Sequence, residues 1–115
     1  MRALLIVAVC LAAAGCGDAP KPAPQAREQP AVVQADMRDN RFAPRRIVVR
    51  VGQVVRWTNR DAVAHTVASQ ALKLSSEGIE SGDSFSYRPR RAGRFPYYCT
   101  IHAGQTGVLV VRPGP

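Results

Sequence analysis

The sequence is poor in the residues that build covalent frameworks and soft-metal surfaces. Its 115 residues include only three Cys, two Met and two His. So few cysteines exclude a scaffold of several disulfides. No segment repeats its apolar residues with a helical period, which argues against a helical domain. The longest apolar run, Ala3–Ala14, is too short to cross a membrane as a helix.

The start of the chain has the pattern of an export signal. A basic residue, Arg2, precedes the apolar run, and small residues follow the run up to Cys16. The stretch Ala13-Ala14-Gly15-Cys16 resembles the lipobox of bacterial lipoproteins, in which the peptide is cut before the Cys and the Cys receives a lipid. We therefore expect residues 1–15 to be a lipoprotein signal peptide and Cys16 to be acylated. The alternative is an ordinary cleaved signal with a chance Cys.

A proline-rich segment follows the signal. Residues 17–31 carry four prolines and no large apolar side chain. Such a segment cannot contribute to a core, and its prolines favour the extended polyproline II conformation. We expect residues 16–31 to be an acylated Cys with a tether, and residues 32–115 to be the folded domain. The protein would then be exported and anchored by lipid to a bacterial membrane, facing the periplasm or the cell exterior.

Short runs of β-branched and aromatic residues, separated by turn residues, recur through residues 32–115. The candidate strands are Val32–Met37, Arg46–Val51, Val54–Asn59, His65–Ala68, Ser84–Arg88, Arg94–Cys99 and Val108–Arg112. Short strands with turns every ~8–12 residues are typical of a two-sheet antiparallel sandwich. We predict an all-β, Greek-key β-sandwich of seven or eight strands. Residues 39–44 are expected to form a loop, and residues 69–82 receive no clear assignment.

Two local patterns make sharper predictions. Gly52 and Gln53 alone separate two candidate strands, which predicts a hairpin in which Gly52 adopts a positive φ. In the strand that ends at Cys99, alternation places Phe95 and Tyr97 on the same core-facing side as that Cys. Pro96 in the same strand has no N–H to donate, so it should face a bulge or a gap in the strand pairing.

Cysteine usage singles out one residue of the folded domain. Cys10 leaves with the signal and Cys16 is assigned to the lipid, so Cys99 is the only thiol in residues 32–115. A lone thiol in an oxidising compartment cannot form an internal disulfide and is prone to oxidation. Cys99 is therefore either a metal ligand or a buried, inert core residue.

Both histidines of the sequence can join Cys99 in one site. His102 follows it by three residues, on a loop between two predicted strands, and His65 lies on an earlier strand. One thiolate and two imidazoles form the trigonal donor set of a blue copper site, which needs only a weak fourth, axial ligand. A structural zinc site is the alternative for these residue types.

The chain resembles the cupredoxins of the plastocyanin and amicyanin type over about residues 36–112. The segments that carry the resemblance are Val51–Asn59, Ala64–Val67, Gly82–Tyr87, Ala92–Phe95 and the loop that begins at Cys99. The resemblance implies a cupredoxin domain at residues 32–115. It also implies that His65, Cys99 and His102 bind one copper ion, which alternates between Cu⁺ and Cu²⁺.

The chain departs from the amicyanin pattern at the axial position. Short-loop relatives run Cys-x-x-His-x-x-Met, with the Met as axial ligand, and Gln105 occupies that position here. Stellacyanin-type relatives use a Gln oxygen there, so the resemblance implies that Gln105 is the axial ligand. An amide oxygen is a harder donor than a thioether and should favour oxidised copper. We therefore expect a lower reduction potential than in Met-ligated relatives.

These features predict a type 1 copper protein that passes one electron between membrane-associated or periplasmic redox partners, and not an enzyme. Residues 32–115 hold 13 Lys and Arg against six Asp and Glu, a net charge of +7, which favours acidic partners. Nucleic acid is not expected as a partner of an exported protein, and we expect a monomer. By resemblance, His102 is the electron port, within a small uncharged patch of Ile101, Ala103 and Gly104. The alternatives are copper storage, delivery or sensing, and a small-molecule redox enzyme with an open copper position.

Overall fold

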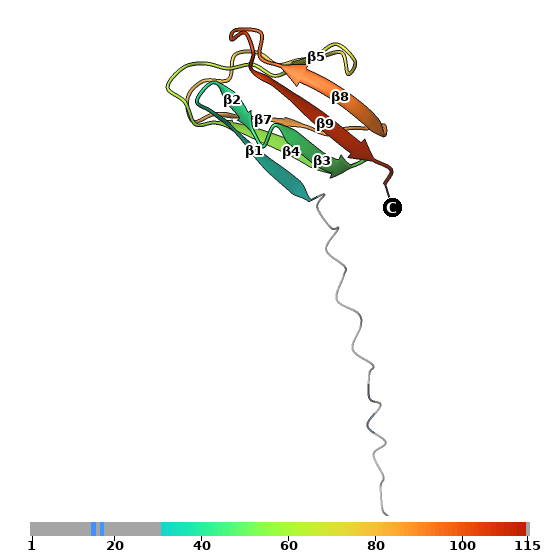
Figure 1. Cartoon of the computed structure of the whole chain (residues 1–115). Helices are drawn as coiled ribbons and strands as arrows, with labels where there is room; N and C mark the ends of the chain where they lie inside the picture. The colour runs from blue at the N-terminus through green and yellow to red at the C-terminus, as the bar shows by residue number, and fades with distance from the viewer. Residues whose placement is uncertain (1–14, 16, 18–30, 115) are drawn as a thin grey trace, which may run out of the picture.

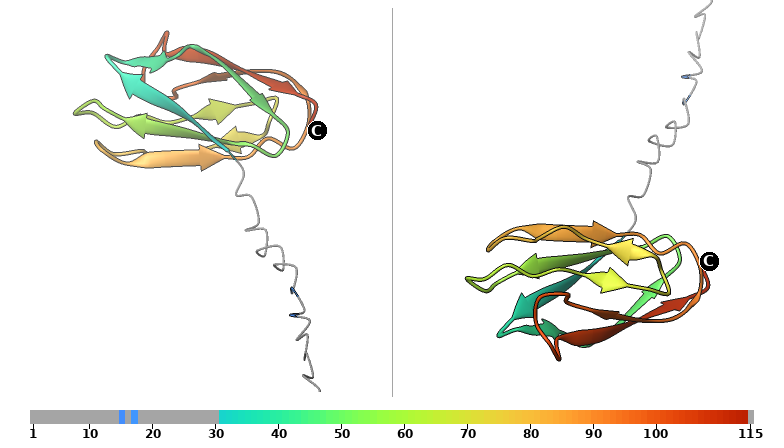
Figure 2. Two further views of the ribbon diagram at one scale, coloured as in Figure 1. Left: turned by 90° about the horizontal axis from the view of Figure 1, so that it is seen from below. Right: turned by 90° about the horizontal axis from the view of Figure 1, so that it is seen from above.

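A computed structural model of the protein describes residues 31–114, together with Gly15 and Gly17. Apart from Gly15, Gly17 and residue 31, the predicted signal peptide, the predicted lipidation site and the predicted tether lie outside these residues. The described chain folds into two stacked sheets (Figure 1, Figure 2). Among the residues that the structure describes, no helix is long and apolar enough to cross a membrane.

Nine strands are present in the described part of the chain. One sheet has the order β2-β1-β4-β7, made of β1 (Val32–Arg38), β2 (Arg41–Ala43), β4 (Val54–Asn59) and β7 (Ser84–Tyr87). The other has the order β3-β9-β8-β5-β6, made of β3 (Arg46–Arg50), β5 (Ala68–Ser69), β6 (Leu74–Ser75), β8 (Gly93–Tyr98) and β9 (Thr106–Arg112). The predicted all-β two-sheet sandwich is confirmed, with nine strands in place of seven or eight.

The prediction of an antiparallel sandwich was wrong for two of the strand pairs. β1 pairs with β4 in parallel, and β3 pairs with β9 in parallel. The chain crosses from one sheet to the other between β2 and β3, and again between β3 and β4. Two strands of one sheet that are connected through the other sheet can run parallel. Two strands connected by a hairpin are always antiparallel.

The predicted hairpin between β3 and β4 was also wrong. The turn itself exists, because Gln53 N–H donates to the carbonyl of Arg50 at 3.1 Å and Gly52 has a φ of 90°. The strands on either side of the turn nevertheless belong to different sheets. Val51 N–H donates to the carbonyl of Arg112, and Gly52 N–H donates to the carbonyl of Pro89. The turn therefore bridges the two layers, and its N–H groups bond to segments outside β4.

Three short segments were missed or misplaced by the sequence patterns. Arg41–Ala43, within the expected loop, pairs with β1 as β2. The expected strand at His65–Ala68 is reduced to a single bridge between His65 and Ile79, followed by β5. The unassigned residues 69–82 contain β6 and Ile79. Pairs of two or three residues depend on a neighbouring strand, and a run of that length carries little periodic signal.

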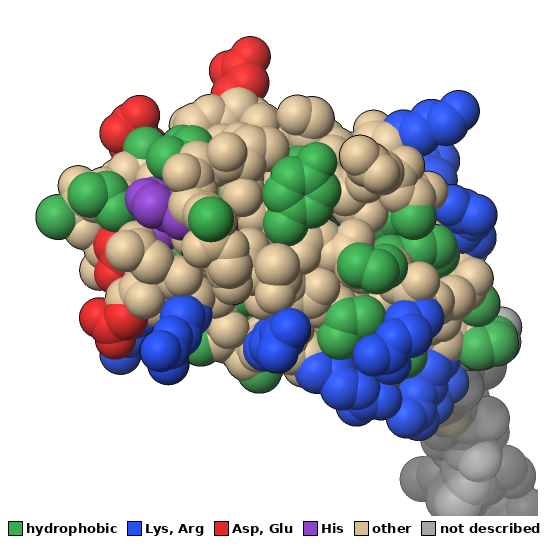
Figure 3. All heavy atoms as spheres, turned by 45° about the horizontal axis from the view of Figure 1, so that its top comes forward, with side chains coloured by type: hydrophobic (Ala, Val, Ile, Leu, Met, Phe, Trp, Pro, Cys, Tyr) green, Lys and Arg blue, Asp and Glu red, His purple; other side chains and the backbone are tan. Residues whose placement is uncertain are grey.

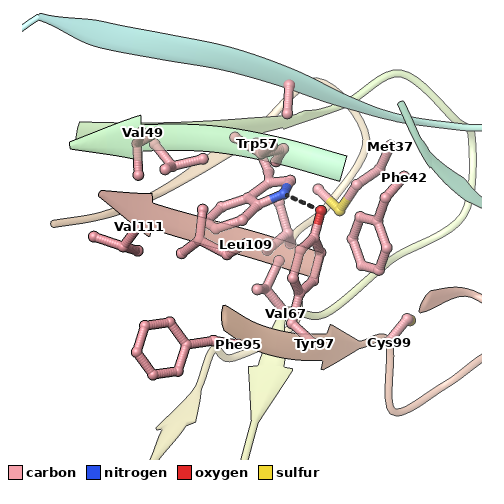
Figure 4. Close-up of a cluster of buried hydrophobic side chains, with 14 residues drawn as sticks. Met37, Phe42, Val49, Trp57, Val67, Phe95, Tyr97, Cys99, Leu109 and Val111 are labelled. Atoms are coloured by element: carbon pink, nitrogen blue, oxygen red, sulfur yellow. Dashed lines mark hydrogen bonds between the residues drawn. The ribbon is translucent and has the colours of Figure 1, made fainter. Parts of the chain in front are cut away.

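The core is built from the inward faces of both sheets, around Trp57 (Figure 4). The Trp57 ring packs edge to face against the ring of Tyr97, with centroids 5.3 Å apart. The indole N–H of Trp57 donates to the hydroxyl of Tyr97 at 3.4 Å. Burial raises the pKa of Tyr97 to about 12, although the hydrogen bond from Trp57 acts in the opposite direction. Phe95, Tyr97 and Cys99 are all buried, as predicted. Cys99 therefore follows a strand that is anchored in packed aromatic side chains.

Pro96 lies where strand pairing is incomplete. It faces Val108 of β9, whose N–H donates to the carbonyl of Arg45 at 2.9 Å, so this pair exchanges no hydrogen bonds. On the other side of β8, β5 pairs only at Tyr98. Within the described residues no strand needs an N–H from Pro96, which confirms the predicted gap.

Candidate metal centre

The sequence-predicted ligands come together at one end of the sandwich. Cys99 and His102 lie in the loop between β8 and β9, and His65 lies between β4 and β5. One ligand atom from each residue lies within 4.8 Å of the others. His65 is wholly buried, Cys99 is 4 % exposed and His102 is half-buried. The site is thus closed toward the core and reaches solvent through one imidazole.

Backbone hydrogen bonds hold both ligand loops in place. His65 exchanges two with Ile79: its N–H donates at 3.1 Å, and its carbonyl accepts at 2.7 Å. On the other loop, Cys99 N–H donates to the carbonyl of Gln105 at 2.9 Å, and Gln105 N–H donates to the carbonyl of His102 at 3.3 Å. The second loop is thus closed on itself, with Cys99, His102 and Gln105 lining one tight turn.

Asp61 orients the ring of His65. Its carboxylate lies 2.7 Å from Nε2 of His65, and it also accepts the N–H groups of Asp39 and Asn40. The hydrogen bond from Asn40 is the main cause that lowers the pKa of Asp61, with those from His65 and Asp39 adding to it. An ionised carboxylate can only accept, so Nε2 carries the proton and Nδ1 keeps its lone pair. That Nδ1 is buried and has no hydrogen-bond partner among the described residues.

The surroundings of Cys99 lower the pKa of its thiol. Burial alone would raise its pKa, but hydrogen bonds outweigh burial and lower it to about 6. The main donors are the N–H groups of Thr66 and Ile101 and the imidazole of His102, whose Nδ1 lies 3.6 Å from Sγ. A thiolate is the form that ligates metals. These contacts therefore favour the ligand state of Cys99 before any metal arrives.

Thr66 joins the two ligand loops. Its hydroxyl accepts the N–H of Thr100 at 2.8 Å, lies 2.8 Å from the Thr100 hydroxyl, and is 3.7 Å from Sγ of Cys99. Thr66 directly follows His65, and Thr100 directly follows Cys99. These bonds therefore hold two of the ligands in one relative position.

Gln105 is buried beside the cluster with its amide unpaired. The side chain is 1 % exposed, and neither its oxygen nor its nitrogen has a hydrogen-bond partner among the described residues. A buried polar group without a partner is costly and calls for an explanation. A metal ion that accepted a lone pair from the amide oxygen would give that oxygen a partner.

The residues present fit a copper ion. One thiolate and two imidazoles converge, and a lone pair on His65 and an oxygen on Gln105 are left without partners. One thiolate and two imidazoles match the donor set of a blue copper site. Structural zinc sites instead complete four firm ligands of sulfur, nitrogen or carboxylate type, and here the fourth neighbour is an amide.

Sequence reasoning missed two residues that support the site, Asp61 and Asn59. The buried amide of Asn59 donates to the carbonyls of Val63 and Ile79 and accepts the N–H of Asp61. It thus shapes the loop that presents Asp61 to His65. The sequence did contain a signal for Asp61, which lies four residues before the candidate ligand His65. Ligating histidines commonly donate their second N–H to a carboxylate.

A family model described as a cupredoxin-like domain matches residues 3–111. The chain belongs to this family. Its cupredoxin relatives include the amicyanin-alpha of Methylorubrum extorquens, 27 % identical over 123 residues that cover 96 % of this chain and 99 % of the relative. The amicyanin of Paracoccus denitrificans is 28 % identical over 84 residues, which cover 69 % of this chain and 64 % of the relative.

Solved cupredoxin structures show the same architecture. A methionine-to-glutamine variant of amicyanin with Cu(I) matches with a TM-score of 0.67 and 28 % identity, covering 71 % of this chain and 83 % of the variant. A purple cupredoxin from Nitrosopumilus maritimus matches with a TM-score of 0.63 and 26 % identity, covering 70 % of this chain and 99 % of that chain. The two-sheet sandwich is therefore the cupredoxin fold.

The mouth of the site is apolar. Next to half-buried His102 in the loop, the side chain of Ile101 is 53 % exposed, and Ala103 and Gly104 are exposed as well. Figure 3 shows the histidine among hydrophobic side chains. His102 thus reaches the surface beside uncharged residues of its own loop.

Proposed function

We propose that this cupredoxin is a type 1 copper electron carrier. The observation that carries the proposal is the convergence of His65, Cys99 and His102, with ligand atoms within 4.8 Å, in a chain of the cupredoxin family. When bound, copper supplies a one-electron couple between Cu⁺ and Cu²⁺. In this proposal the cluster transfers electrons and has no catalytic activity of its own.

The residues around the cluster hold the three ligands in fixed positions. Asp61 holds the ring of His65, the hydroxyl of Thr66 ties the two loops, and the core below Cys99 is packed with aromatic rings. A site with little freedom to rearrange suits electron transfer, because the ligands need not move when the charge of the metal changes.

We infer that electrons enter and leave through His102, because it alone of the three ligands reaches solvent. Its uncharged neighbours Ile101, Ala103 and Gly104 suit a small, transient contact with a redox protein, since they carry no charge to desolvate. We propose that the carrier acts as a monomer, without nucleic acid.

The test is an optical and EPR spectrum of the whole chain loaded with Cu²⁺. An intense thiolate-to-copper band that ascorbate bleaches and an oxidant restores would support the electron carrier. A protein that stays colourless and binds copper weakly would contradict it. Easy exchange of Cu(I) with a chelator would instead favour storage, delivery or sensing, and turnover with peroxide or nitric oxide would favour an enzyme with an open copper position.

We further propose that the amide oxygen of Gln105 is the axial ligand. Replacing Gln105 with Met is then expected to raise the reduction potential by more than about 59 mV, the shift that corresponds to a tenfold change in preference between the two oxidation states. The softer thioether favours Cu⁺ relative to the amide oxygen. Cyclic voltammetry of the loaded protein measures the shift.

Gln70→Met is the matched control for this variant, because Gln70 is exposed and its change should leave the potential unaltered. An unchanged or lower potential in Gln105→Met would remove Gln105 from the ligand set.

We also propose that the chain is exported and held at a bacterial membrane by lipid on Cys16, after removal of residues 1–15. Cys16→Ser is expected to abolish incorporation of labelled fatty acid and to release the protein from the membrane fraction into the soluble fraction. Cys10→Ser should change neither. Full labelling of Cys16→Ser would show that the lipid, if any, is attached elsewhere.

A further inference from the structure

The acidic side chains of the domain gather at one of its ends, where Arg38 and Arg60 pair with Asp36. All six acidic residues of the described domain lie toward the end that holds His65: Asp36, Asp39, Asp61, Glu77, Glu80 and Asp83. Strand register and hydrogen bonds place them there. Asp39 N–H donates to the carboxylate of Asp61, and the carbonyl of Asp83 accepts the N–H of Asn59, the last residue of β4. Glu77 and Glu80 flank Ile79, which bridges to His65.

The opposite end carries only basic charge among the described residues. Its exposed arginines are Arg50, Arg88, Arg90 and Arg112. They border the turn at Gly52, whose N–H donates to the carbonyl of Pro89, between Arg88 and Arg90. Arg50 and Arg112 face each other in the pairing of β3 with β9. None of the four forms an ion pair within the described part of the chain.

This arginine end is also where the chain enters the domain. Val54, just after the turn at Gly52, donates its N–H to the carbonyl of Ala31 at 3.1 Å, directly before β1. Figure 1 places the start of β1 and the C-terminal end at the same end of the sandwich. In Figure 3 a group of basic side chains gathers at the lower right, whereas acidic side chains lie around the histidine at the left.

We propose that this arginine end binds the surface of an anionic lipid bilayer, so that the histidine end faces away from the membrane. Four like charges with no acidic neighbour attract an anionic surface within a Debye length of about 8 Å at physiological ionic strength. Each basic residue that reaches such a surface strengthens binding about fivefold. The acidic residues at the far end are repelled by the same surface, which gives the domain a preferred orientation.

The position of the arginines favours lipid over an acidic protein as the occupant. Cys16 lies fifteen residues before Ala31, a distance of at most about 50 Å even in a fully extended chain. A lipid on Cys16 would therefore keep this end close to the bilayer at a high effective concentration. In that respect the inference rests on the proposed attachment of lipid, although the attraction itself is a property of the arginines.

A second group of arginines offers a matched control. Arg45, Arg46 and Arg94 line a groove of about 640 Å³ on the outer face of the second sheet, together with Pro96 and Tyr98. The groove holds the same number of positive charges as Arg50, Arg90 and Arg112. Because it lies on a sheet face and not around the chain entry, a bilayer that contacts the arginine end does not need it.

The experiment measures the binding of the whole chain, carrying Cys16→Ser, to vesicles by flotation. Vesicles of phosphatidylcholine alone are compared with vesicles of equal parts phosphatidylcholine and phosphatidylglycerol. The tested triple variant is Arg50→Gln, Arg90→Gln and Arg112→Gln, and the control is Arg45→Gln, Arg46→Gln and Arg94→Gln. Any binding by the apolar N-terminal run is common to all three proteins, so the ratio between the two vesicle types reports the arginines.

We expect the preference for anionic vesicles to fall about 100-fold in the tested variant and about fivefold or less in the control, since three contacts at about fivefold each are removed only from the first. Equal losses in both variants, or no preference for anionic vesicles in the parent chain, would overturn the proposal. So would binding through these arginines to polyglutamate but not to vesicles, which would assign this end to an acidic protein. Because the chain carries no lipid and the copper spectrum is recorded separately, none of these outcomes is confused with a failure of lipid attachment or of the copper site.

Discussion

Replacing Cys99 with Ser is expected to abolish the intense visible band of the copper-loaded protein and to leave only the weak absorption of Cu²⁺ bound by nitrogen and oxygen. The reason is that the band requires a thiolate, and Cys99 is the only cysteine at the cluster. Serine has nearly the same shape, but its hydroxyl is a hard donor that does not ionise near neutral pH. Absorption and EPR spectra at equal copper loading measure the loss.

Cys16→Ser is the matched control, because it removes a thiol from the same chain without touching the cluster. Its copper spectrum should equal that of the parent chain. Unfolding of the copper-free proteins by denaturant separates a lost ligand from a lost fold, since serine at this buried position also affects packing. A Cys99→Ser protein that stays folded and retains the band would exclude the thiolate as the source of the colour.

The convergence of His65, Cys99 and His102 could be predicted from the sequence because the folded domain has so few residues that bind soft metals. A single thiol, one His three residues later and one other His are few enough to allow one plausible donor set. The order of the strand segments, which resembles that of cupredoxins, then brought the distant His to the same end. The buried face of β8 could be predicted for a simpler reason, since alternation over six residues is a local pattern.

The failed hairpin shows what local patterns do not contain. Gly52 and Gln53 form the tight turn that their sequence predicts, but a turn of this kind can join two strands of one sheet or bridge two sheets. What decides is the destination of the N–H groups: Val51 and Gly52 bond to Arg112 and Pro89, which lie about forty or more residues later in the sequence. Such long-range pairing leaves no periodic trace near the turn.

The residues that support the metal centre could not be predicted from the sequence for a related reason. Asp61 and Asn59 act through hydrogen bonds that exist only after β4 ends and its loop folds back over Ile79. Short polar residues after a strand are common, and most of them form turns. The burial of Asn59 and the 2.7 Å contact between Asp61 and His65 distinguish these two from ordinary turn residues.

Asp61→Ala should therefore weaken copper binding by about 10–100-fold, the usual consequence of removing a hydrogen-bond partner of a ligating His. Without the carboxylate, the proton of His65 can move to Nδ1, which removes the lone pair that faces Cys99. The loop also loses the acceptor of two N–H groups, those of Asp39 and Asn40. Competition with a chelator of known affinity measures the change.

Asp83→Ala is the comparison for the loss of one acidic charge, because Asp83 is exposed and only its backbone bonds to neighbouring residues. Its copper affinity should be unchanged. Asp61→Asn separates the two roles of the carboxylate: the amide oxygen can still accept an N–H, but it no longer carries the charge that holds the proton on Nε2. An intermediate affinity in Asp61→Asn would show that both roles contribute. Equal affinity in Asp61→Ala and the parent chain would mean that the backbone bonds between His65 and Ile79 suffice to orient the ring.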